Sequence, residues 1–442
     1  MKEFILPQFQ NFKREYDLAV QCNRCGFCET VCPTYMVSGK ETLSPRGRNQ
    51  ALRNILEGKL QDPSAARDIF STCLTCHACT NVCFAQVPVG RLMGAAKEIS
   101  QPLAQNAVGR ACLAVQRAAF HFFLFQRYFL SLALWLVFIF KRTGIPAALK
   151  KIGLLKLMSR RLNEAEDLVL EAPLSFWRVR EGGGGEGSKG SKGSEGGGRG
   201  VGGDTAFFSA CGMHYLFPSA SMAIRKVAEK TGSQLSYKSH SCCGLIPQSA
   251  GDPQTARELA KKNIRDFLRF QTLLVSDDSC AGFMKSYPAL LAENFQSVDF
   301  SSKVKNLSEF LVERGYLNDP RSTAANLRVT YHDPCQMGNG QKSFNSPRAI
   351  LKNIPGVEFV ELEEAEWCCG GAGTYALEHP ALADNILERK MANILKTGAQ
   401  VVITQAASCL LHVGLGLRRK GLEGTIRVLH LAEFLKTGDQ IR

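Results

Sequence analysis

Two short cysteine-rich runs constrain this chain more than any other part of its sequence. Residues 22–33 read CNRCGFCETVCP, and residues 73–84 read CLTCHACTNVCF. Each run has the spacing C-x2-C-x2-C-x3-C, with Pro33 after the first run and Phe84 at the equivalent position of the second. Zinc sites typically use two separated pairs of ligands. This single-row spacing instead favours iron, a metal that thiolate ligands suit well.

The spacing of both runs is typical of bacterial ferredoxins that carry two [4Fe–4S] clusters. In that arrangement, the first three cysteines of a run hold one cluster and the fourth cysteine reaches the other cluster. We therefore expect a first cluster on Cys22, Cys25, Cys28 and Cys83, and a second cluster on Cys73, Cys76, Cys79 and Cys32.

The residues between the two runs predict a helical insert. The stretch SPRGRNQALRNILEG starts with Ser44, a suitable N-cap, followed by Pro45, which favours the first helical position. Arg46 and Arg48 fall in the first turn of this helix. Two roles stay open for them: tuning a nearby cluster, or forming the solvated start of the helix.

The C-terminal half of the chain reads as a duplication. Each copy has an apolar strand ending at a cysteine, then a CCG triplet, a helix, and another strand followed by a cysteine. Corresponding cysteines lie at positions 211 and 335, 242 and 368, and 280 and 409, with offsets of 124, 126 and 129. These similar offsets indicate two homologous α/β domains. Because sites in open α/β sheets form beyond the carboxyl ends of the strands, we expect the four thiols of each copy to meet at one edge.

Adjacent cysteines are poor disulfide partners, because successive side chains diverge. On a glycine-rich turn, two neighbouring thiolates can instead approach a metal closely. We expect a first CCG site on Cys211, Cys242, Cys243 and Cys280, and a second CCG site on Cys335, Cys368, Cys369 and Cys409. Spacing does not choose between a further iron–sulfur cluster and zinc at these sites, and buried core cysteines are the simpler alternative.

These motifs together resemble the iron–sulfur subunit of bacterial glycolate oxidase. The segments that carry the resemblance are CGFCETVCPTY, SPRGR, CLTCHAC, SCAGFMKSY, CCGGAGTYALEHPALA and SCLLH. Iron–sulfur subunits of lactate oxidation and of anaerobic glycerol-3-phosphate dehydrogenase share the architecture, and heterodisulfide reductase shares the CCG domains. In that reductase each CCG domain ends in C-x-x-C, whereas Phe283 and His412 stand at the second cysteine position here. We expect His412 to be a packed or solvated helix residue in preference to a metal ligand.

The resemblance implies a subunit of an oxidoreductase, with no catalytic residue on this chain. FAD-containing dehydrogenase subunits would oxidise a 2-hydroxy acid, glycolate or lactate, and this chain would pass electrons toward a quinone or another membrane acceptor. The alternatives are a heterodisulfide-reductase-like thiol–disulfide oxidoreductase and the equivalent subunit of anaerobic glycerol-3-phosphate dehydrogenase. The sequence carries no dinucleotide fingerprint and no nucleophile elbow, as expected for such a subunit.

The expected fold is a multidomain mixture of α+β and α/β parts. A helical two-cluster ferredoxin-type domain precedes two duplicated α/β CCG domains. The predicted segments are a ferredoxin-type domain at 1–100, a cationic apolar helical segment at 101–181, a Gly/Ser-rich linker at 182–203, a first CCG domain at 204–325 and a second CCG domain at 326–442. The linker is low in complexity, so we expect it to be flexible.

Charge and hydropathy predict a surface partner. The formal net charge is +14, and residues 99–163 contain ten basic residues and no acidic one. The apolar stretch 118–142 is interrupted too early for a membrane span, which needs about 20 apolar residues. We expect a helix that either lies on anionic lipid or docks on protein, and no nucleic-acid partner. Because no secretory signal opens the chain, we expect a cytoplasmic protein, peripheral on the inner face of the cytoplasmic membrane.

Overall fold

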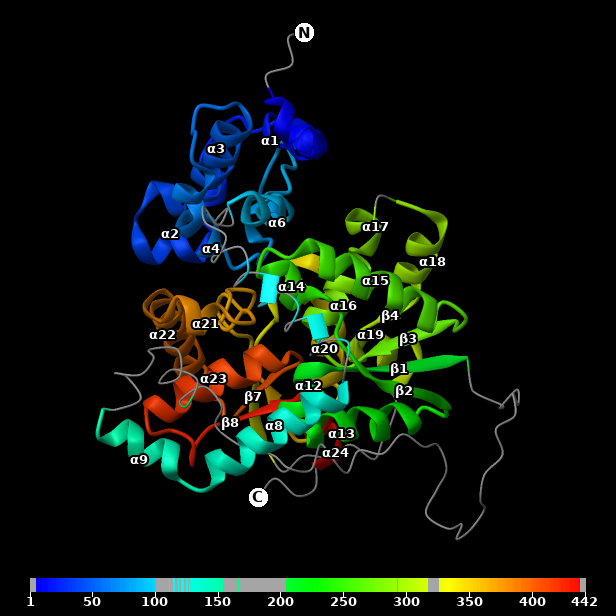
Figure 1. Ribbon diagram of the computed structural model, residues 1–442. Coiled ribbons are helices and arrows are strands. Elements are labelled where there is room, and N and C mark those ends of the chain that lie inside the picture. Colours follow the sequence, from blue (N-terminus) through cyan, green and yellow to red (C-terminus); the bar gives the residue numbers. More distant parts are fainter. Residues whose placement is uncertain are drawn as a thin grey trace.

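The computed structural model shows three packed parts (Figure 1). It describes residues 5–100, 127–153, 204–291, 293–316 and 326–437, with scattered positions from 111 to 125 and residue 166. We call residues 5–100 the ferredoxin unit, 204–316 the first CCG domain and 326–437 the second CCG domain. The linker predicted at 182–203 lies outside the described residues.

The ferredoxin unit is helical, and short helices frame its two cysteine-bearing loops. Its elements are η1 Pro7–Phe12, α1 Lys13–Ala19, η2 Phe27–Glu29, α2 Pro33–Ser38, η3 Glu41–Leu43, α3 Pro45–Leu56, η4 Pro63–Ala66, α4 Arg67–Ser71, α5 Ala78–Asn81 and α6 Val89–Ile99. Helix α3 begins as predicted, because the Ser44 hydroxyl oxygen accepts the Gly47 backbone N–H at 3.0 Å. Its buried face packs against α1 and α6 around Leu52 and Leu92.

Each CCG domain contains a four-stranded parallel sheet. The first sheet has the order β2-β1-β3-β4, and the second has the matching order β6-β5-β7-β8. The strands are β1 Thr205–Ala210, β2 Leu235–Ser241, β3 Thr272–Val275, β4 Val304–Lys305, β5 Leu327–Tyr331, β6 Val357–Phe359, β7 Val401–Thr404 and β8 Arg427–His430. Strands such as VVIT in β7 are buried along their whole length, as parallel strands covered on both faces require. The predicted fold class, a helical ferredoxin-type part followed by two α/β domains, is confirmed.

Helices provide the crossovers that parallel strands need. They are α12 Cys211–Leu216, α13 Pro218–Glu229, α14 Leu245–Ser249, α15 Pro253–Phe267, α16 Asp278–Lys285, α17 Tyr287–Leu290, α18 Phe295–Lys303, α19 Leu307–Glu313, α20 Asn345–Lys352, α21 Tyr375–Glu378, α22 Pro380–Lys396, α23 Ala407–Arg419 and α24 Leu431–Thr437, with a π-helical turn η7 at Gln336–Gly340. Helices α15 and α22 occupy the stretches where helices were predicted. The short edge strands β4 and β8 were not predicted.

The two CCG domains pack as matched halves. Helix α13 lies against α24 of the other domain, and α20 lies in the same way against α19. The buried carboxyl group of Asp277 also joins the domains. Its Oδ1 accepts the backbone N–H groups of Ser279 and Cys280 at 2.8 and 3.2 Å, and its Oδ2 accepts that of Ala407 at 2.8 Å. One side chain therefore caps α16 and α23, the helices that carry the last cysteine of each CCG site.

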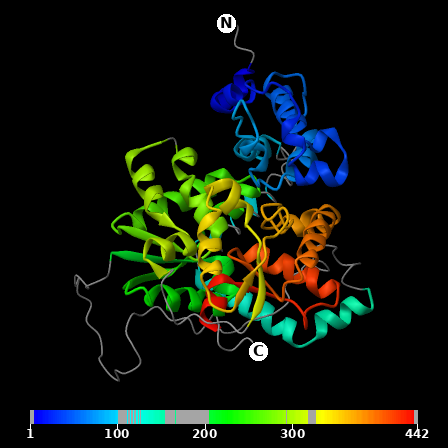
Figure 2. The same cartoon turned by 180° about the vertical axis from the view of Figure 1, so that it is seen from behind.

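Helix α8, Arg127–Arg142, docks on the first CCG domain through one face. Ser131 Oγ lies 3.0 Å from Tyr215 Oη, and Phe138 packs on the same tyrosine. The first CCG domain, not the ferredoxin unit, is thus the docking surface for the described part of the segment 118–142. Figures 1 and 2 show α8 and the next helix, α9 Ile145–Lys151, at the end of the molecule opposite the ferredoxin unit.

The other face of α8 is exposed and apolar. Its exposed large side chains are Tyr128, Phe129, Leu132, Leu136, Val137 and Phe140. No single helix in the described part of the chain has the length and hydropathy of a membrane span. Helices α8 and α9 meet those two criteria only as a pair, with a 59° bend between them.

Candidate metal centres

The structure brings the first ferredoxin-type set of thiols to one cavity of about 210 Å³. This set is Cys22, Cys25, Cys28 and Cys83. Gly26 makes the turn between two of these cysteines with a φ of 86°, which L side chains rarely adopt. The Cys25 side chain is exposed, whereas burial raises the pKa of the Cys28 thiol to about 11. Arg46 lines the same cavity.

The second ferredoxin-type set lies deeper in the molecule. Cys32, Cys73, Cys76 and Cys79 line a second, smaller cavity. Burial raises the pKa of the Cys76 and Cys79 thiols well above the usual thiol value. Among the described residues, no carboxylate lines either cavity, and four thiols form the donor set that an iron–sulfur cluster takes. Each cavity gathers its predicted set, but Cys79 lines both cavities, so the crossed assignment and ligation by these thiols stay predictions.

Arg48 ties the second set together. Its guanidinium is fully buried, and Nη1 donates to Cys32 Sγ at 3.8 Å. Nη2 donates to the hydroxyl groups of Thr34 and Thr72, at 2.9 and 3.0 Å. Two roles were left open for this arginine. A position beside a cluster fits the structure better than a solvated helix start, because Arg48 is buried and contacts the predicted ligand Cys32. Arg48 therefore puts a positive charge beside the second set.

The first CCG site forms at the carboxyl ends of β1, β2 and β3. Cys243 and Cys280 place their sulfurs 3.0 Å apart, and a hydrogen bond with Cys242 raises the pKa of the Cys211 thiol. Two side chains hold the CCG turn through hydrogen bonds to its backbone carbonyls. Tyr287 donates its hydroxyl to the Cys243 carbonyl at 2.6 Å, and Asn263 donates to the Cys242 carbonyl at 3.0 Å.

The second CCG site repeats this pairing at the ends of β5, β6 and β7. The sulfurs of Cys335 and Cys368 lie 4.0 Å apart, and those of Cys369 and Cys409 lie 3.5 Å apart. Hydrogen bonds from Cys368 and Cys409 lower the pKa of the Cys369 thiol well below its usual value. All four thiols predicted for each CCG site thus converge, because the parallel strands end at one edge.

Of the packed and solvated positions left open for His412, the structure shows the packed one, beneath the second CCG turn. His412 Nδ1 lies 2.6 Å from the Cys369 carbonyl oxygen. A carbonyl only accepts, so the ring donates this hydrogen bond. His412 thereby positions the turn through its backbone.

Sequence reasoning missed His332. This buried residue follows β5, and a ring nitrogen lies within 4.8 Å of the sulfurs of Cys369 and Cys409. The available signal was its position in the tetrapeptide HDPC, three residues before Cys335. The predicted ligand sets contained only cysteines, so this histidine was left out of them.

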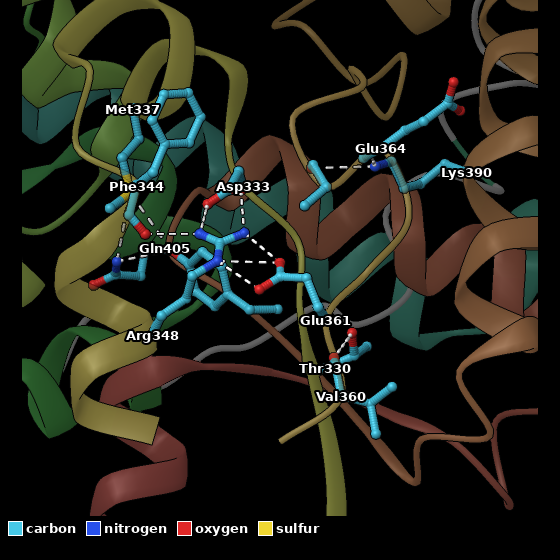
Figure 3. A network of polar contacts seen from close by, with 12 residues as sticks. Thr330, Asp333, Met337, Phe344, Arg348, Val360, Glu361, Glu364, Lys390 and Gln405 are labelled. Carbon is cyan, nitrogen blue, oxygen red and sulfur yellow. Dashed lines mark hydrogen bonds and ion pairs between the residues drawn. The ribbon is translucent and has the colours of Figure 1, made fainter. Parts of the chain in front are cut away.

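A partly buried ion-pair network positions the loop that carries His332 (Figure 3). Arg348 donates to both carboxylate oxygens of Asp333, at 3.0 and 2.8 Å, and also binds Glu361. Lys390 of α22 donates to the carbonyl oxygens of Glu364 and Ala365 in the loop before the second CCG turn, and burial lowers the pKa of this amine to about 8. Bidentate arginine pairs impose geometry as well as energy. The network therefore fixes the two loops that carry the second CCG site.

The second ferredoxin-type set packs directly on the second CCG site. Cys76 and Leu74 share an apolar cluster with Cys335, Cys368 and Trp367. Two hydrogen bonds join the loops around these thiols: Gln336 Nε2 donates to the Thr75 carbonyl, and Asn81 Nδ2 donates to Asn339 Oδ1, both at 2.9 Å. Cys76 of the ferredoxin unit and the pair Cys335 and Cys368 of the second CCG site therefore lie in one continuous apolar region.

Part of the positive charge lies in a cleft of about 860 Å³ between the ferredoxin unit and both CCG domains. Its basic residues are Arg14, Arg91, Lys97, Arg257, Lys261 and Lys342, against the two acidic residues Glu15 and Glu98. Lys97 crosses the boundary and donates to the carbonyls of Cys73 and Ser249, both at 3.2 Å. The charge balance favours an anion or an acidic surface in this cleft.

Comparison with known proteins agrees with the geometry. Residues 19–87 match the family described as 4Fe-4S dicluster domain, and residues 205–285 and 329–414 match the family described as cysteine-rich domain. The chain is 31% identical over 441 residues to the probable glycolate oxidase iron-sulfur subunit of Bacillus subtilis, covering 97% of each chain.

Two further relatives cover about half of this chain. One subunit of the fumarate reductase (CoM/CoB) of Methanothermobacter marburgensis is 32% identical over 240 residues, which are 54% of this chain and 47% of that protein. Lactate utilization protein A of Oceanobacillus iheyensis is 27% identical over 237 residues, which are 52% of this chain and 96% of that protein.

We predict that Arg48→Gln lowers the reduction potential of the cluster at the second ferredoxin-type set. The change removes a positive charge and a donor that stabilise the added electron. The shift should be tens of millivolts, since a tenfold change in a one-electron equilibrium corresponds to about 59 mV. A redox titration followed by EPR measures both clusters.

Arg46→Gln is the matched control, because Arg46 lines the other cavity and its loss should move the other cluster. Arg48→Lys keeps the charge and should restore part of the potential. Equal shifts of both clusters in Arg48→Gln, or no shift at all, would contradict the assignment.

Proposed function

Because the chain belongs to the family of glycolate oxidase iron–sulfur subunits, we propose that it is the electron-transfer subunit of a membrane-associated dehydrogenase that oxidises glycolate or lactate. FAD-containing partner subunits supply the electrons, and a quinone or another membrane acceptor receives them. The observation that carries this proposal is that Cys76 of the ferredoxin unit and Cys335 of the second CCG domain pack against the same apolar cluster. It places a predicted cluster site directly beside a second thiol site.

The residues of the chain hold and shield the redox groups in this proposal. When bound, each [4Fe–4S] cluster supplies one-electron chemistry at its four cysteines. Cys25 of the first ferredoxin-type set is exposed, whereas in the second set Cys32 is buried and the other three cysteines are half-buried. Arg48 covers Cys32.

An aromatic pair beside the first set supports a partner contact there. Phe84 is 81% exposed and Phe27 is 54% exposed, and their rings meet edge to face with centroids 5.2 Å apart. Both line the cavity of the first set. Exposed aromatic side chains are enriched in protein interfaces, where they bury large areas. We place the flavoprotein contact at this surface.

The exposed face of α8 supports attachment to the inner surface of the cytoplasmic membrane. Leu132, Leu136 and Phe140 present an apolar stripe at helical spacing. Arg142 ends this helix, and Lys150 and Lys151 end α9, whereas Lys141 is paired with Glu166. An apolar face bordered by cations is typical of helices that lie on anionic lipid.

We predict that the purified chain does not oxidise glycolate or lactate with a redox dye. Iron–sulfur clusters transfer single electrons, and removing a hydride from an alcohol carbon needs a flavin or nicotinamide. Adding the FAD-containing partner subunits should couple oxidation of either acid to reduction of a soluble quinone. Phe84→Ala should slow this coupled reaction at unchanged iron content. Dye reduction by the chain alone, at the rate of the complex, would contradict the subunit assignment.

We also predict that Leu136→Asp with Phe140→Asp weakens flotation with anionic vesicles by at least about tenfold. Each buried apolar side chain contributes about 1.5–3 kcal/mol, and binding should also weaken in high salt. Val298→Asp, at an exposed apolar residue of α18, is the matched control. Flotation that is equal in both variants would reassign the α8 face to a protein partner.

A further inference from the structure

The duplicated CCG domains differ at two positions inside otherwise matched sites. Phe208 and His332 each lie three residues before the first cysteine of their site, and Phe283 and His412 each lie three residues after the last. The packing confirms that the second pair is equivalent. A Cβ added at Gly244 would lie 3.3 Å from the Phe283 ring, and one added at Gly370 would lie 3.1 Å from the His412 ring. The first site therefore has two phenyl rings where the second has two imidazoles.

The two imidazoles have different environments. His412 donates Nδ1–H to the Cys369 carbonyl oxygen at 2.6 Å, which gives it a positioning role. The His332 side chain is fully buried, and among the described residues neither ring nitrogen has a nitrogen or oxygen partner, while the Cys369 thiol lies within hydrogen-bond reach of the ring. A thiol is only a weak hydrogen-bond partner. A buried polar group with so weak a partner calls for a further one, such as a bound ion.

The position of His332 identifies what satisfies it. One ring nitrogen lies within 4.8 Å of the sulfurs of Cys369 and Cys409, and all three residues are buried. Imidazole nitrogen and thiolate sulfur together form a common donor set for zinc and for some iron–sulfur centres. In the first site Phe208 fills the corresponding position and packs on Phe267, with ring centroids 5.7 Å apart. A phenyl ring offers no lone pair to a metal.

We propose that His332 is a metal ligand of the second CCG site, which therefore takes a mixed imidazole–thiolate donor set. The first CCG site takes thiolates alone. This inference rests on metal binding at the CCG sites in the proposed function. An imidazole in place of a thiolate raises the reduction potential of an iron–sulfur centre, because it carries no negative charge. The duplication thus produced two centres of different potential from one architecture.

The loop geometry supports this assignment. Asp333, the next residue, is held by the bidentate contact with Arg348, and the backbone N–H of His332 donates to the Ile403 carbonyl oxygen at 2.9 Å. Both contacts fix the backbone on either side of the imidazole. Metal sites require such support to hold a ligand in place.

The test compares the full-length chain with its His332→Ala and His332→Cys variants after anaerobic iron–sulfur reconstitution. Hyperfine EPR detects a nitrogen bound to a paramagnetic iron centre, and X-ray absorption distinguishes nitrogen from sulfur around zinc. The predicted ferredoxin-type clusters have only sulfur ligands, so they add no directly bound nitrogen. We expect a bound imidazole signal in the wild type, its loss in both variants, and a lower potential with retained metal in His332→Cys.

His412→Asn is the control, because it removes a buried imidazole but keeps an amide donor for the Cys369 carbonyl. It should retain the nitrogen signal. An all-sulfur environment in metal-loaded wild type, or a nitrogen signal that survives His332→Ala, would overturn the inference while leaving the proposed function intact. A second CCG site that binds neither iron nor zinc would overturn the inference too. Electron transfer from the FAD-containing subunits to a soluble quinone tests the proposed function separately.

Discussion

The contact between the ferredoxin unit and the second CCG domain is the constraint on which the other features depend. Cys76 and Leu74 pack with Trp367, Cys368 and Cys335 in one apolar cluster. Burial in this cluster raises the pKa of Cys76, and the nearby Cys335 raises it further. Thiols in so apolar a region stay protonated unless a positive charge compensates their ionisation. A bound metal cluster would supply that charge, so the packing is compatible with the proposed redox role.

The duplicated CCG domains contain equivalent thiol sites, but the two sites have different neighbours. Asp277 caps helices of both domains, so the two CCG sites share a rigid frame. The cluster of Cys76 and Leu74 nevertheless contains cysteines of the second site only. The helix α8 docks near Cys211 of the first site. The copy that docks α8 and the copy whose cysteines share a cluster with Cys76 are thus different.

Local sequence patterns predicted most of the fold and the thiol sets. Ser44 and Pro45 marked the start of α3, and the duplicated order of strands and cysteines indicated two α/β domains with convergent thiols. These inferences succeeded because capping, strand patterning and the edge of a parallel sheet depend on sequence order alone. The edge strand β4 was missed because two residues carry no usable periodicity.

The remaining features depend on contacts between distant segments. Arg48 reaches Cys32 only after α3 folds back on the first cysteine run. His332 joins Cys369 and Cys409 only when strands β5, β6 and β7 align. The docking of Gln336 on Thr75 joins residues 261 positions apart. No local pattern records such pairings, although Phe283 against His412 and the tetrapeptide HDPC already distinguish the two CCG copies in the sequence.

The most direct test of the central claim compares two matched double variants by EPR after reconstitution and reduction. One variant replaces Cys368 and Cys369 with serine, and the other replaces Cys242 and Cys243 in the same way. If the second CCG site is the neighbour of the ferredoxin-type clusters, only the first variant should narrow the lines of one cluster and slow its spin relaxation. The same change in the Cys242 and Cys243 variant alone, or identical spectra in both variants, would contradict the account.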